Sequence, residues 1–329
     1  MRILLTLFLV CLYSTCPGVD LDQPEVQSFI DEMVNKHDFD RDQLSAVLLG
    51  AEKKQAILDA ISKPAEKSLN WADYRKIFIT PERIQAGVDF WRDNATTLTK
   101  VADDSGVPPE MLVGIIGVET YFGRITGNYR VLDALSTLAF YYPKRSKFFR
   151  KELTEYLILA REEDMPAEEA TGSYAGAMGR PQFMPSSFRA YAVDSTGDGK
   201  RDIWNNWTDV AGSIANYFTR HGWTHGGEVV ADASLGSAWK CEPPTPASNS
   251  LTPQDTVASL SAKGVLFATD MPNDSDAQLL ALEGEDGDEF WVGFDNFFVI
   301  TRYNRSVMYA MAVHQLGQEI AREYRAHVG

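Results

Sequence analysis

The chain has 329 residues, of which 44% are hydrophobic and 23% charged. This composition is typical of a globular protein of about two domains, and it excludes collagen-like repeats and extended disorder. Asp and Glu number 46 against 31 Lys and Arg, which gives a net charge of −15. We therefore expect no nucleic-acid partner, because binding to phosphates needs a surplus of basic residues.

Residues 1–18 have the pattern of a secretory signal peptide. Arg2 precedes an apolar run over residues 3–12, which is too short to span a bilayer. We predict cleavage near Cys16 or Gly18, and hence export. A lipid-modified Cys16 is the less favoured alternative, because Tyr13 stands where a lipidation site favours Leu.

Helical patterns follow the signal peptide. Apolar residues recur at three and four positions between residues 23 and 100, where Thr80 and Pro81 mark a helix start. Pro108 and Pro109 begin another helix, which we expect to run through about Phe122 and to end at Gly123. Further helical patterns cover residues 133–161 and 208–218.

The pattern changes between residues 226 and 292. Pro/Ser/Thr-rich stretches, an acidic run and short apolar bursts at Val229-Val230 and Val265 to Phe267 predict a small α+β or β insert. An apolar helix over 306–324 then packs back on the helical core. The predicted domains are a signal peptide at 1–18, a helical N-terminal domain at 19–100, a catalytic core at 101–225, the insert at 226–292, and a segment completing the core at 293–329.

Glu119 is the acid that the pattern singles out. It shares a helix face with Leu112, Ile115 and Ile116, which are apolar. A carboxyl group on such a face is poorly solvated, and this suits a general acid near neutral pH. The alternative is a helix-end glutamate that reaches water or a loop backbone.

Residues 172–187 form a loop rich in glycine and proline. Such a loop lets the backbone approach a ligand closely and presents Ser173 and Gln182 as hydrogen-bonding groups. The alternative is a tight connection before a helix capped by Ser186 or Ser187. The residues by themselves favour neither interpretation.

A second loop begins with the pattern of a calcium-binding loop. Gly199 stands at the position of the sharp turn, Lys200 offers its backbone carbonyl, and oxygen-bearing side chains recur at Asp194, Thr196, Asp198 and Asp202. Asn205 replaces the usual glutamate at the twelfth position, so the closing ligand has to come from elsewhere, with Asp209 as the candidate. The role we expect for such an ion is structural.

Other polar groups are less informative. Asn304, after Tyr303, can point its amide into a cleft, or it can stand in a turn with Ser306 capping the last helix. A basic cluster at residues 144–151 is expected to be a solvated helix face. The five histidines show no zinc motif and Cys241 is the only cysteine after residue 18, so we expect neither zinc nor a disulfide.

Three segments in this order resemble the B-type lytic murein transglycosylases, exported enzymes that cleave the glycan strands of peptidoglycan. They are residues 117–123 (GVETYFG), 173–187 (SYAGAMGRPQFMPSS) and 296–313 (NFFVITRYNRSVMYAMAV). The resemblance implies a mainly α fold, α+β overall: a lysozyme-like helical core, a helical N-terminal domain and a small inserted β-containing domain.

The resemblance also assigns roles to residues. The single catalytic glutamate of the family falls on Glu119, and its substrate-binding positions fall on Ser173, Gln182 and Asn304, beside Tyr303. The ligands of its calcium-type loop fall on Asp194, Thr196, Asp198, Lys200 and Asp209. A structural Ca²⁺ or Na⁺ is therefore implied, and no cofactor is required for the chemistry.

The implied reaction breaks the bond between N-acetylmuramic acid and N-acetylglucosamine without water and leaves a 1,6-anhydro ring. The expected partner is the glycan strand, the expected state a periplasmic monomer, and partners among cell-wall synthesis or division proteins are left open. One alternative is a hydrolytic muramidase, in which Asp133 or another carboxylate activates water. The other is a non-catalytic murein-binding or scaffold protein.

Overall fold

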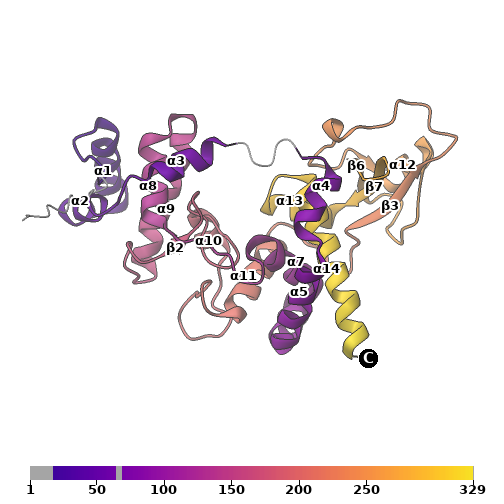
Figure 1. The fold of residues 1–329 in the computed structure, drawn as a ribbon, viewed down its shortest axis with the longest axis horizontal. Helices are drawn as coiled ribbons and strands as arrows, with labels where there is room; N and C mark the ends of the chain where they lie inside the picture. Colours follow the sequence, from indigo (N-terminus) through magenta and orange to yellow (C-terminus); the bar gives the residue numbers. More distant parts are fainter. Residues whose placement is uncertain (1–17, 64–68, 329) are drawn as a thin grey trace, which may run out of the picture.

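The computed structural model describes residues 18–63 and 69–328. The predicted signal peptide lies outside this part, except for Gly18. The fold of this part is mainly helical, as predicted, with a five-stranded sheet and a two-stranded ribbon, and it is elongated (Figure 1). No helix in the described ranges is both long enough and apolar enough to cross a membrane.

The helical pattern before residue 106 folds into six separate helices within residues 18–63 and 69–105. Thr80 caps the fifth, as predicted, since its Oγ1 accepts a hydrogen bond from the Arg83 N–H at 3.2 Å. The helices are α1 (Pro24–His37), α2 (Arg41–Leu49), α3 (Gln55–Ser62), α4 (Trp71–Phe78), α5 (Pro81–Asp93) and α6 (Ala95–Ser105).

Helix α7 (Pro109–Thr120) is the central helix of the larger core. It is buried on almost every side, which matches its nearly continuous apolar sequence. It runs antiparallel to the last helix, α14 (Val307–Val328), and the two backbones approach closely at glycines. A Cβ on Gly114 would lie 2.5 Å from the Val313 carbonyl oxygen, and one on Gly317 would lie 2.2 Å from that of Glu110. These contacts fix the register of the two helices.

The helical pattern at 133–161 is interrupted at Pro143, where a 3-10 turn, η1 (Pro143–Arg145), separates two helices. Proline lacks the N–H that a continuous helix would need there. A two-stranded ribbon precedes the loop at residues 173–187. The elements of this part are β1 (Tyr129–Arg130), α8 (Val131–Tyr141), α9 (Ser146–Glu162), β2 (Thr171–Gly172), α10 (Pro185–Tyr191) and α11 (Trp207–Arg220).

The described strands between residues 230 and 294 form one antiparallel sheet in the order β4-β6-β7-β3-β5. Successive side chains of β6 point to opposite faces of the sheet. Leu279 packs toward helix α12, while Leu280 and Leu282 join the larger core. The elements are β3 (Val230–Leu235), η2 (Pro246–Ser248), β4 (Asp255–Thr256), α12 (Val257–Lys263), β5 (Val265–Phe267), β6 (Asp276–Glu283) and β7 (Asp288–Phe294).

The chain returns from the sheet to the helical core through α13 (Asp295–Tyr303). Asn296 is buried at this junction, where its side chain accepts a hydrogen bond from the Thr224 N–H and donates to the Thr224 and Gly227 carbonyls. Asn296 therefore joins the chain after the last strand, β7, to the segment that precedes the first strand of the sheet, β3. The domain boundaries given above stay a prediction.

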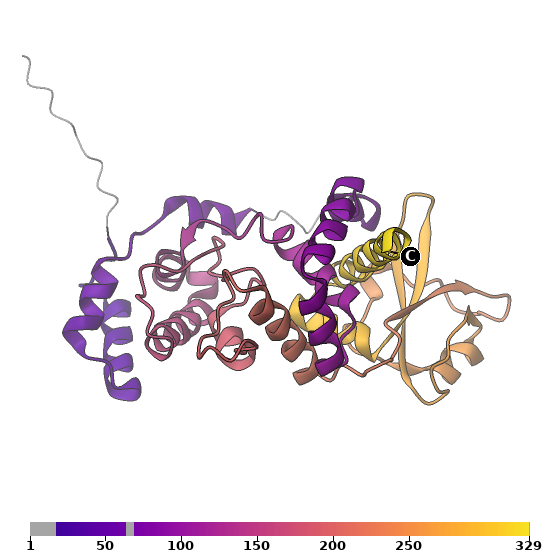
Figure 2. The same ribbon diagram turned by 90° about the horizontal axis from the view of Figure 1, so that it is seen from below.

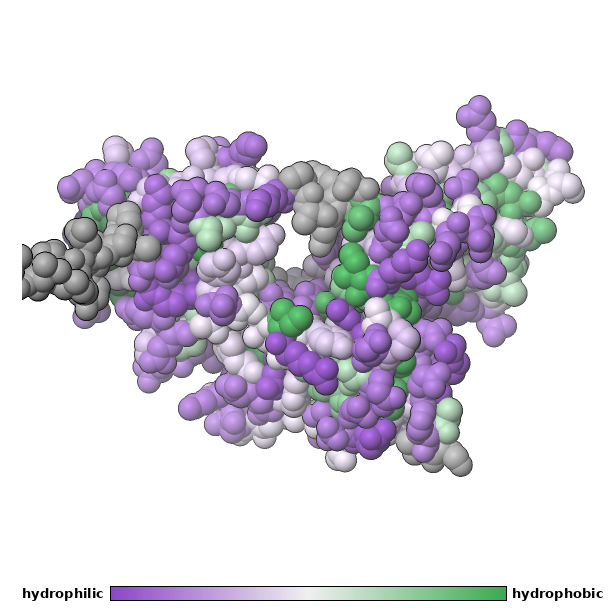
Figure 3. Space-filling model, viewed as in Figure 1, coloured by the Kyte–Doolittle hydropathy of each residue, from purple (hydrophilic) through white to green (hydrophobic). Residues whose placement is uncertain are grey.

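The molecule has two parts on either side of α7 and α11. One contains α1 to α3 and α8 to α10, and the other contains α4, α5, α14 and the sheet (Figures 1 and 2). The space-filling view is hollowed between them (Figure 3). The carboxyl end of α7 lies between these two parts.

Candidate active site

Glu119 lies in the last turn of α7 and is half-buried. The buried hydroxyl of Tyr309, in the first turns of α14, donates a hydrogen bond of 2.5 Å to its Oε1. The antiparallel register fixed at Gly114 and Gly317 brings these two residues opposite each other. A short bond from a neutral donor to a carboxylate is among the stronger hydrogen bonds of proteins, and it holds the carboxyl group in one orientation.

Helix α7 ends at Thr120, two residues before the expected end. Tyr121 and Phe122 adopt left-handed conformations with φ of 49° and 59°, and Gly123 follows with φ of 79°. The Thr120 hydroxyl donates to the Arg180 carbonyl at 3.2 Å and accepts from the Gly123 N–H at 3.1 Å. The strained turn after Glu119 is therefore tied to the loop at residues 173–187.

Ser173 begins this loop, and two backbone N–H groups of the loop hold the hydroxyl oxygen of Ser173. The Ser173 Oγ accepts hydrogen bonds from the N–H groups of Ala175 and Ala177, at 3.2 and 3.1 Å. Neither of these bonds uses the hydroxyl proton. Gly172 permits this tight fold, because a Cβ there would lie 2.1 Å from the Ala177 carbonyl oxygen.

Gln182 is held in a left-handed conformation with φ of 53°. Its amide nitrogen donates to the carbonyls of Gly179 at 2.7 Å and Thr126 at 3.1 Å. Both protons of the amide group are thus used within the chain, and its oxygen is the end that can accept a hydrogen bond from a ligand.

The third segment meets the loop through Tyr303, whose hydroxyl donates to the Pro181 carbonyl at 2.7 Å. Asn304 follows at the end of α13 and is exposed. Ser306 caps α14, as one of the two interpretations predicted, by accepting a hydrogen bond from the Tyr309 N–H at 3.3 Å. The three sequence segments therefore converge on the end of α7.

Burial raises the pKa of both Tyr303 and Tyr309 well above the usual value, and the negative charge of Glu119 raises each further. Both phenols are therefore neutral hydrogen-bond donors over the physiological pH range. Tyr309 therefore stays uncharged while it donates its hydrogen bond to the carboxyl group of Glu119.

Asp133 is unsuited to activate water. Its side chain is buried, it is paired with Arg130 at 2.8 Å, and its Oδ1 also accepts the Glu52 N–H at 2.8 Å. These contacts make Asp133 a structural link between α8 and the segment after α2.

The alternative interpretation of this loop had Ser186 or Ser187 capping the helix that follows, and that cap is not formed. Helix α10 has Met184 at its N-cap, and the buried carboxylate of Glu152 takes the place of a local cap. Its oxygens accept hydrogen bonds from the N–H and the hydroxyl of Ser186, at 3.0 and 2.8 Å. A carboxylate from another helix is favourable there, because it meets the positive end of the helix dipole.

The calcium-like loop folds around Asp194. The N–H groups of Gly197 and Gly199 donate to its carboxylate at 2.6 and 2.7 Å, and these bonds lower its pKa, that from Gly199 most strongly. Gly199 has the left-handed conformation expected at the turn, with φ of 87°. Asp198 accepts the Lys200 N–H at 2.9 Å, and Thr196 donates its hydroxyl to Asp194 at 3.2 Å.

Asp209 is fully buried beneath this loop. Its Oδ1 accepts the N–H groups of Ser195 and Thr196, and its Oδ2 accepts that of Asp202 at 3.0 Å. Within the described ranges, no three His, Cys, Asp or Glu side chains lie close enough together to share a metal ion. The oxygen donors that the loop offers are therefore of mixed type: carboxylates, the Thr196 hydroxyl and the Lys200 carbonyl.

Two residues that contact the site, Tyr309 and Arg180, were not predicted from the sequence. The guanidinium of Arg180 lies 3.8 Å above the Trp207 ring and donates to the Asn205 carbonyl, so it links the loop to α11. Tyr309 lies in the third motif segment, but an aromatic residue on an apolar helix stripe is usually a core residue. The only sign of another role in the sequence is that this tyrosine hydroxyl follows closely after the segment Tyr-Asn-Arg-Ser at residues 303–306.

Comparisons with known proteins identify the family of the chain. Residues 21–318 match the family model described as the transglycosylase SLT domain. The chain is 44% identical over 309 residues to membrane-bound lytic murein transglycosylase B of Escherichia coli (strain K12), with 91% of this chain and 83% of that protein covered.

Solved structures match over almost the whole chain. Soluble lytic transglycosylase SltB1 of Pseudomonas aeruginosa is 50% identical, with a TM-score of 0.85, over 91% of this chain and 99% of that one. The lytic transglycosylase Slt35 of Escherichia coli in complex with calcium is 43% identical, with a TM-score of 0.83, over 93% and 96% of the two chains.

Proposed function

Since the chain belongs to the transglycosylase SLT family and is a peptidoglycan-cleaving lyase, we propose that Glu119 acts first as the acid and then as the base of a lytic transglycosylase reaction. The observation that carries this proposal is the contact of Tyr309 with Glu119 at 2.5 Å, at the point where the three motif segments converge.

In the first step the protonated Glu119 donates its proton to the oxygen that joins N-acetylmuramic acid to N-acetylglucosamine. That bond breaks, and positive charge develops at the muramic anomeric carbon. The carboxylate of Glu119 then takes the proton of the muramic C6 hydroxyl, whose oxygen attacks the anomeric carbon and closes the 1,6-anhydro ring. Glu119 is reprotonated and no water is consumed.

The groups around Glu119 position the sugar in this proposal. The Ser173 hydroxyl, the Gln182 amide oxygen and the Asn304 amide orient the muramic residue, including its acetamido group. Tyr303 holds the loop through Pro181. The partner is the peptidoglycan glycan strand, reached after export to the periplasm, with the protein as a monomer.

The proposal is tested by the products released from purified murein sacculi. We expect the protein to release muropeptides lighter by one water than the reducing forms, and we expect Glu119→Gln to release none while it keeps its melting temperature. Glu110→Gln, on the same helix but paired with Arg325 at the surface, is the control that should cleave normally. Reducing-end products would indicate a hydrolase instead, and a fully active Glu119→Gln would refute the assigned role.

We also propose that the loop after α10 binds a structural Ca²⁺, or Na⁺. Asp194, Thr196, Asp198 and the Lys200 carbonyl are the oxygen donors, and Asp209 closes the site through Oδ2, which accepts a single N–H. The fold already gives these oxygens a bent loop with two left-handed glycines, and Ca²⁺ prefers such oxygen ligands.

The ion should stabilise the protein, because it binds only to the folded loop. We expect the melting temperature to rise on addition of calcium, relative to chelator, in the wild type. Asp194→Asn should lose this difference. Equal melting temperatures of the wild type in calcium and in chelator would contradict the site.

A further inference from the structure

The turn that follows Glu119 depends on support from other segments. Tyr121, Phe122 and Gly123 are three consecutive residues with positive φ, and two of them carry side chains for which this conformation is unfavourable. Such a conformation persists only where the surrounding structure holds it in place. Because Glu119 lies in the last turn of α7, directly before this segment, whatever holds the turn also holds the end of the helix that carries the acid.

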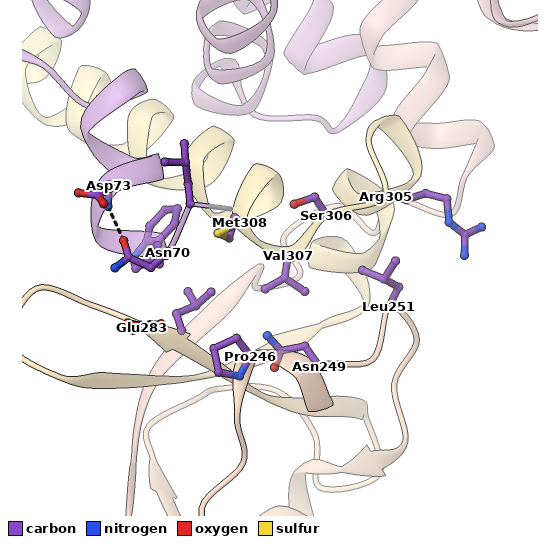
Figure 4. Close-up of a pocket in the computed structure, with 13 residues that line it drawn as sticks. Asn70, Asp73, Pro246, Asn249, Leu251, Glu283, Arg305, Ser306, Val307 and Met308 are labelled. Atoms are coloured by element: carbon purple, nitrogen blue, oxygen red, sulfur yellow. Dashed lines mark hydrogen bonds between the residues drawn. The ribbon is translucent and has the colours of Figure 1, made fainter. Parts of the chain in front are cut away.

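The surroundings of the site are not equally filled on all sides. Next to Tyr309, the side chains of Ser306, Val307 and Met308 line a cavity of about 590 Å³ between the start of α14, α4 and β6 (Figure 4). Toward α11 the packing is close. A Cβ on Gly123 would lie 3.0 Å from the Trp207 ring and 3.2 Å from the Arg180 Nε. The turn therefore rests directly on these two side chains.

Arg180 joins four segments at this point. Its N–H donates to the Ile203 carbonyl at 2.9 Å, and its guanidinium donates to the Asn205 carbonyl at 3.1 Å. Its own carbonyl accepts the Thr120 hydroxyl at 3.2 Å. The guanidinium lies 3.8 Å from the centre of the Trp207 ring. Arg180 thus connects the turn after Glu119, the loop at residues 173–187, the end of the calcium-like loop and the start of α11.

The Trp207 ring is a fixed support for this guanidinium. Phe90 packs against it with the ring centres 4.6 Å apart, and Phe90 also stacks on Phe122 of the turn at 5.5 Å. Arg180 is half-buried, and the burial lowers its pKa, which the charge of Asp202 opposes. The contact of a partly desolvated guanidinium with the face of a tryptophan is the strongest form of cation–π interaction. It therefore fixes Arg180 relative to the turn.

The loop that contains Arg180 also carries groups that orient the sugar in the proposed reaction. Gln182 stands two residues after Arg180, and its amide nitrogen donates to the Thr126 carbonyl at 3.1 Å. The loop and the segment after Glu119 therefore meet at two points, Thr120 with Arg180 and Thr126 with Gln182. The Arg180 side chain is fixed to α11 at the first of these points.

We propose that Arg180 is a positioning residue for the reaction, an inference that rests on the proposed function. Its guanidinium, stacked on Trp207, holds the loop against the turn and so sets the position of Glu119 relative to the amide oxygen of Gln182. Without this contact the loop keeps its bond to Thr126 and still binds the sugar, but the acid no longer meets the glycosidic oxygen at a fixed distance. The loss then appears in kcat and leaves KM nearly unchanged.

The kinetic test removes the guanidinium and keeps the length of the side chain. Arg180→Met should lower kcat for the release of anhydro-muropeptides about tenfold, at temperatures well below its melting temperature. Trp207→Phe, which keeps an aromatic face, should retain most of kcat, whereas Trp207→Leu should lose as much as Arg180→Met. The double variant Arg180→Met/Trp207→Leu should lose no more than either single variant, because both changes remove the same contact. Losses that multiply in the double variant would overturn the inference.

The matched control is Arg161→Met. Arg161 lies 4.2 Å from the centre of the Phe39 ring and donates to the His37 carbonyl at 2.9 Å. It therefore makes the same two kinds of contact, but it joins α9 to the segment between α1 and α2. Arg161→Met should keep the kcat of the wild type. Equal losses of kcat in Arg161→Met and Arg180→Met would overturn the inference.

Hydrogen exchange measures the turn without any substrate. The Gly123 N–H donates to the Thr120 hydroxyl at 3.1 Å, so its exchange rate in the NMR spectrum of the full chain reports how often the turn opens. This rate should rise about tenfold in Arg180→Met and stay unchanged in Arg161→Met. An unchanged rate in Arg180→Met, or a wild-type kcat, would overturn the inference while the transglycosylase reaction stands. A wild-type protein that releases no anhydro products would refute the proposed function instead, and with it the role of Arg180 in the reaction.

Discussion

Tyr309→Phe removes one hydroxyl group from the candidate active site and leaves the ring that packs in the core. Tyr309 is 2% exposed, and its hydroxyl donates the 2.5 Å hydrogen bond to Glu119. A hydrogen bond to a charged group is worth about 1.5–3 kcal/mol. If that energy is used to hold the carboxylate in its reactive orientation, kcat should fall about 10- to 150-fold.

The effect should appear in kcat and leave KM unchanged, because the buried Tyr309 acts through Glu119 and not on the sugar. Initial rates of anhydro-muropeptide release at several substrate concentrations measure the two constants. Tyr156→Phe is the matched control: this fully buried tyrosine donates its hydroxyl to the Ala167 carbonyl at 2.6 Å. It should cost about 1 kcal/mol of stability with kcat unchanged.

Two results would refute this reasoning. A Tyr309→Phe variant with the kcat of the wild type would mean that the hydrogen bond does not orient Glu119. Equal losses of kcat in Tyr309→Phe and Tyr156→Phe would mean that the loss reflects stability alone.

Two further predictions concern stability. Burial lowers the pKa of His314 to about 4, whereas the unfolded chain binds this proton near pH 6.5. The free energy of unfolding should therefore fall by about 3 kcal/mol between pH 6.5 and 4. The melting temperature of His314→Leu should depend less on pH than that of the wild type, and parallel curves for the two proteins would contradict the assignment. Glu152→Ala should lower the free energy of unfolding by about 2–3 kcal/mol because it leaves the Ser186 donors unsatisfied. The loss is measured as a lower urea midpoint at constant m-value. Ser186→Ala should lower it by about 1 kcal/mol, and equal losses in the two variants would show that the cap is not made by the carboxylate.

Local features of the fold could be predicted from neighbouring residues. Thr80 and Ser306 cap helices as their positions before Pro81 and Val307 indicate, and Gly199 takes the turn conformation of a metal-type loop. Each of these depends on contacts within a few residues, which the order of residues determines. The position of Glu119 on an apolar helix face is of the same kind.

Contacts between distant segments could not be predicted in this way. Glu152 caps α10 from 34 residues away, whereas the sequence offered only a local serine cap, as one of two interpretations. The sequence offered Asp209 only as a closing metal ligand, and the fold adds that its oxygens accept backbone N–H groups of the loop above it. In both cases a buried carboxylate meets backbone donors of another segment, and only the fold brings the two together.

The sequence by itself determined the family segments, their order and the acid that we propose carries the chemistry. The tertiary structure decided what holds that acid, because Tyr309 lies 190 positions away from Glu119 along the chain. Their contact depends on the antiparallel approach of α7 and α14, which is close only because Gly114 and Gly317 have no side chains. A tyrosine on an apolar stripe looks the same in sequence whether its hydroxyl meets a catalytic carboxylate or a backbone carbonyl, and only packing distinguishes the two.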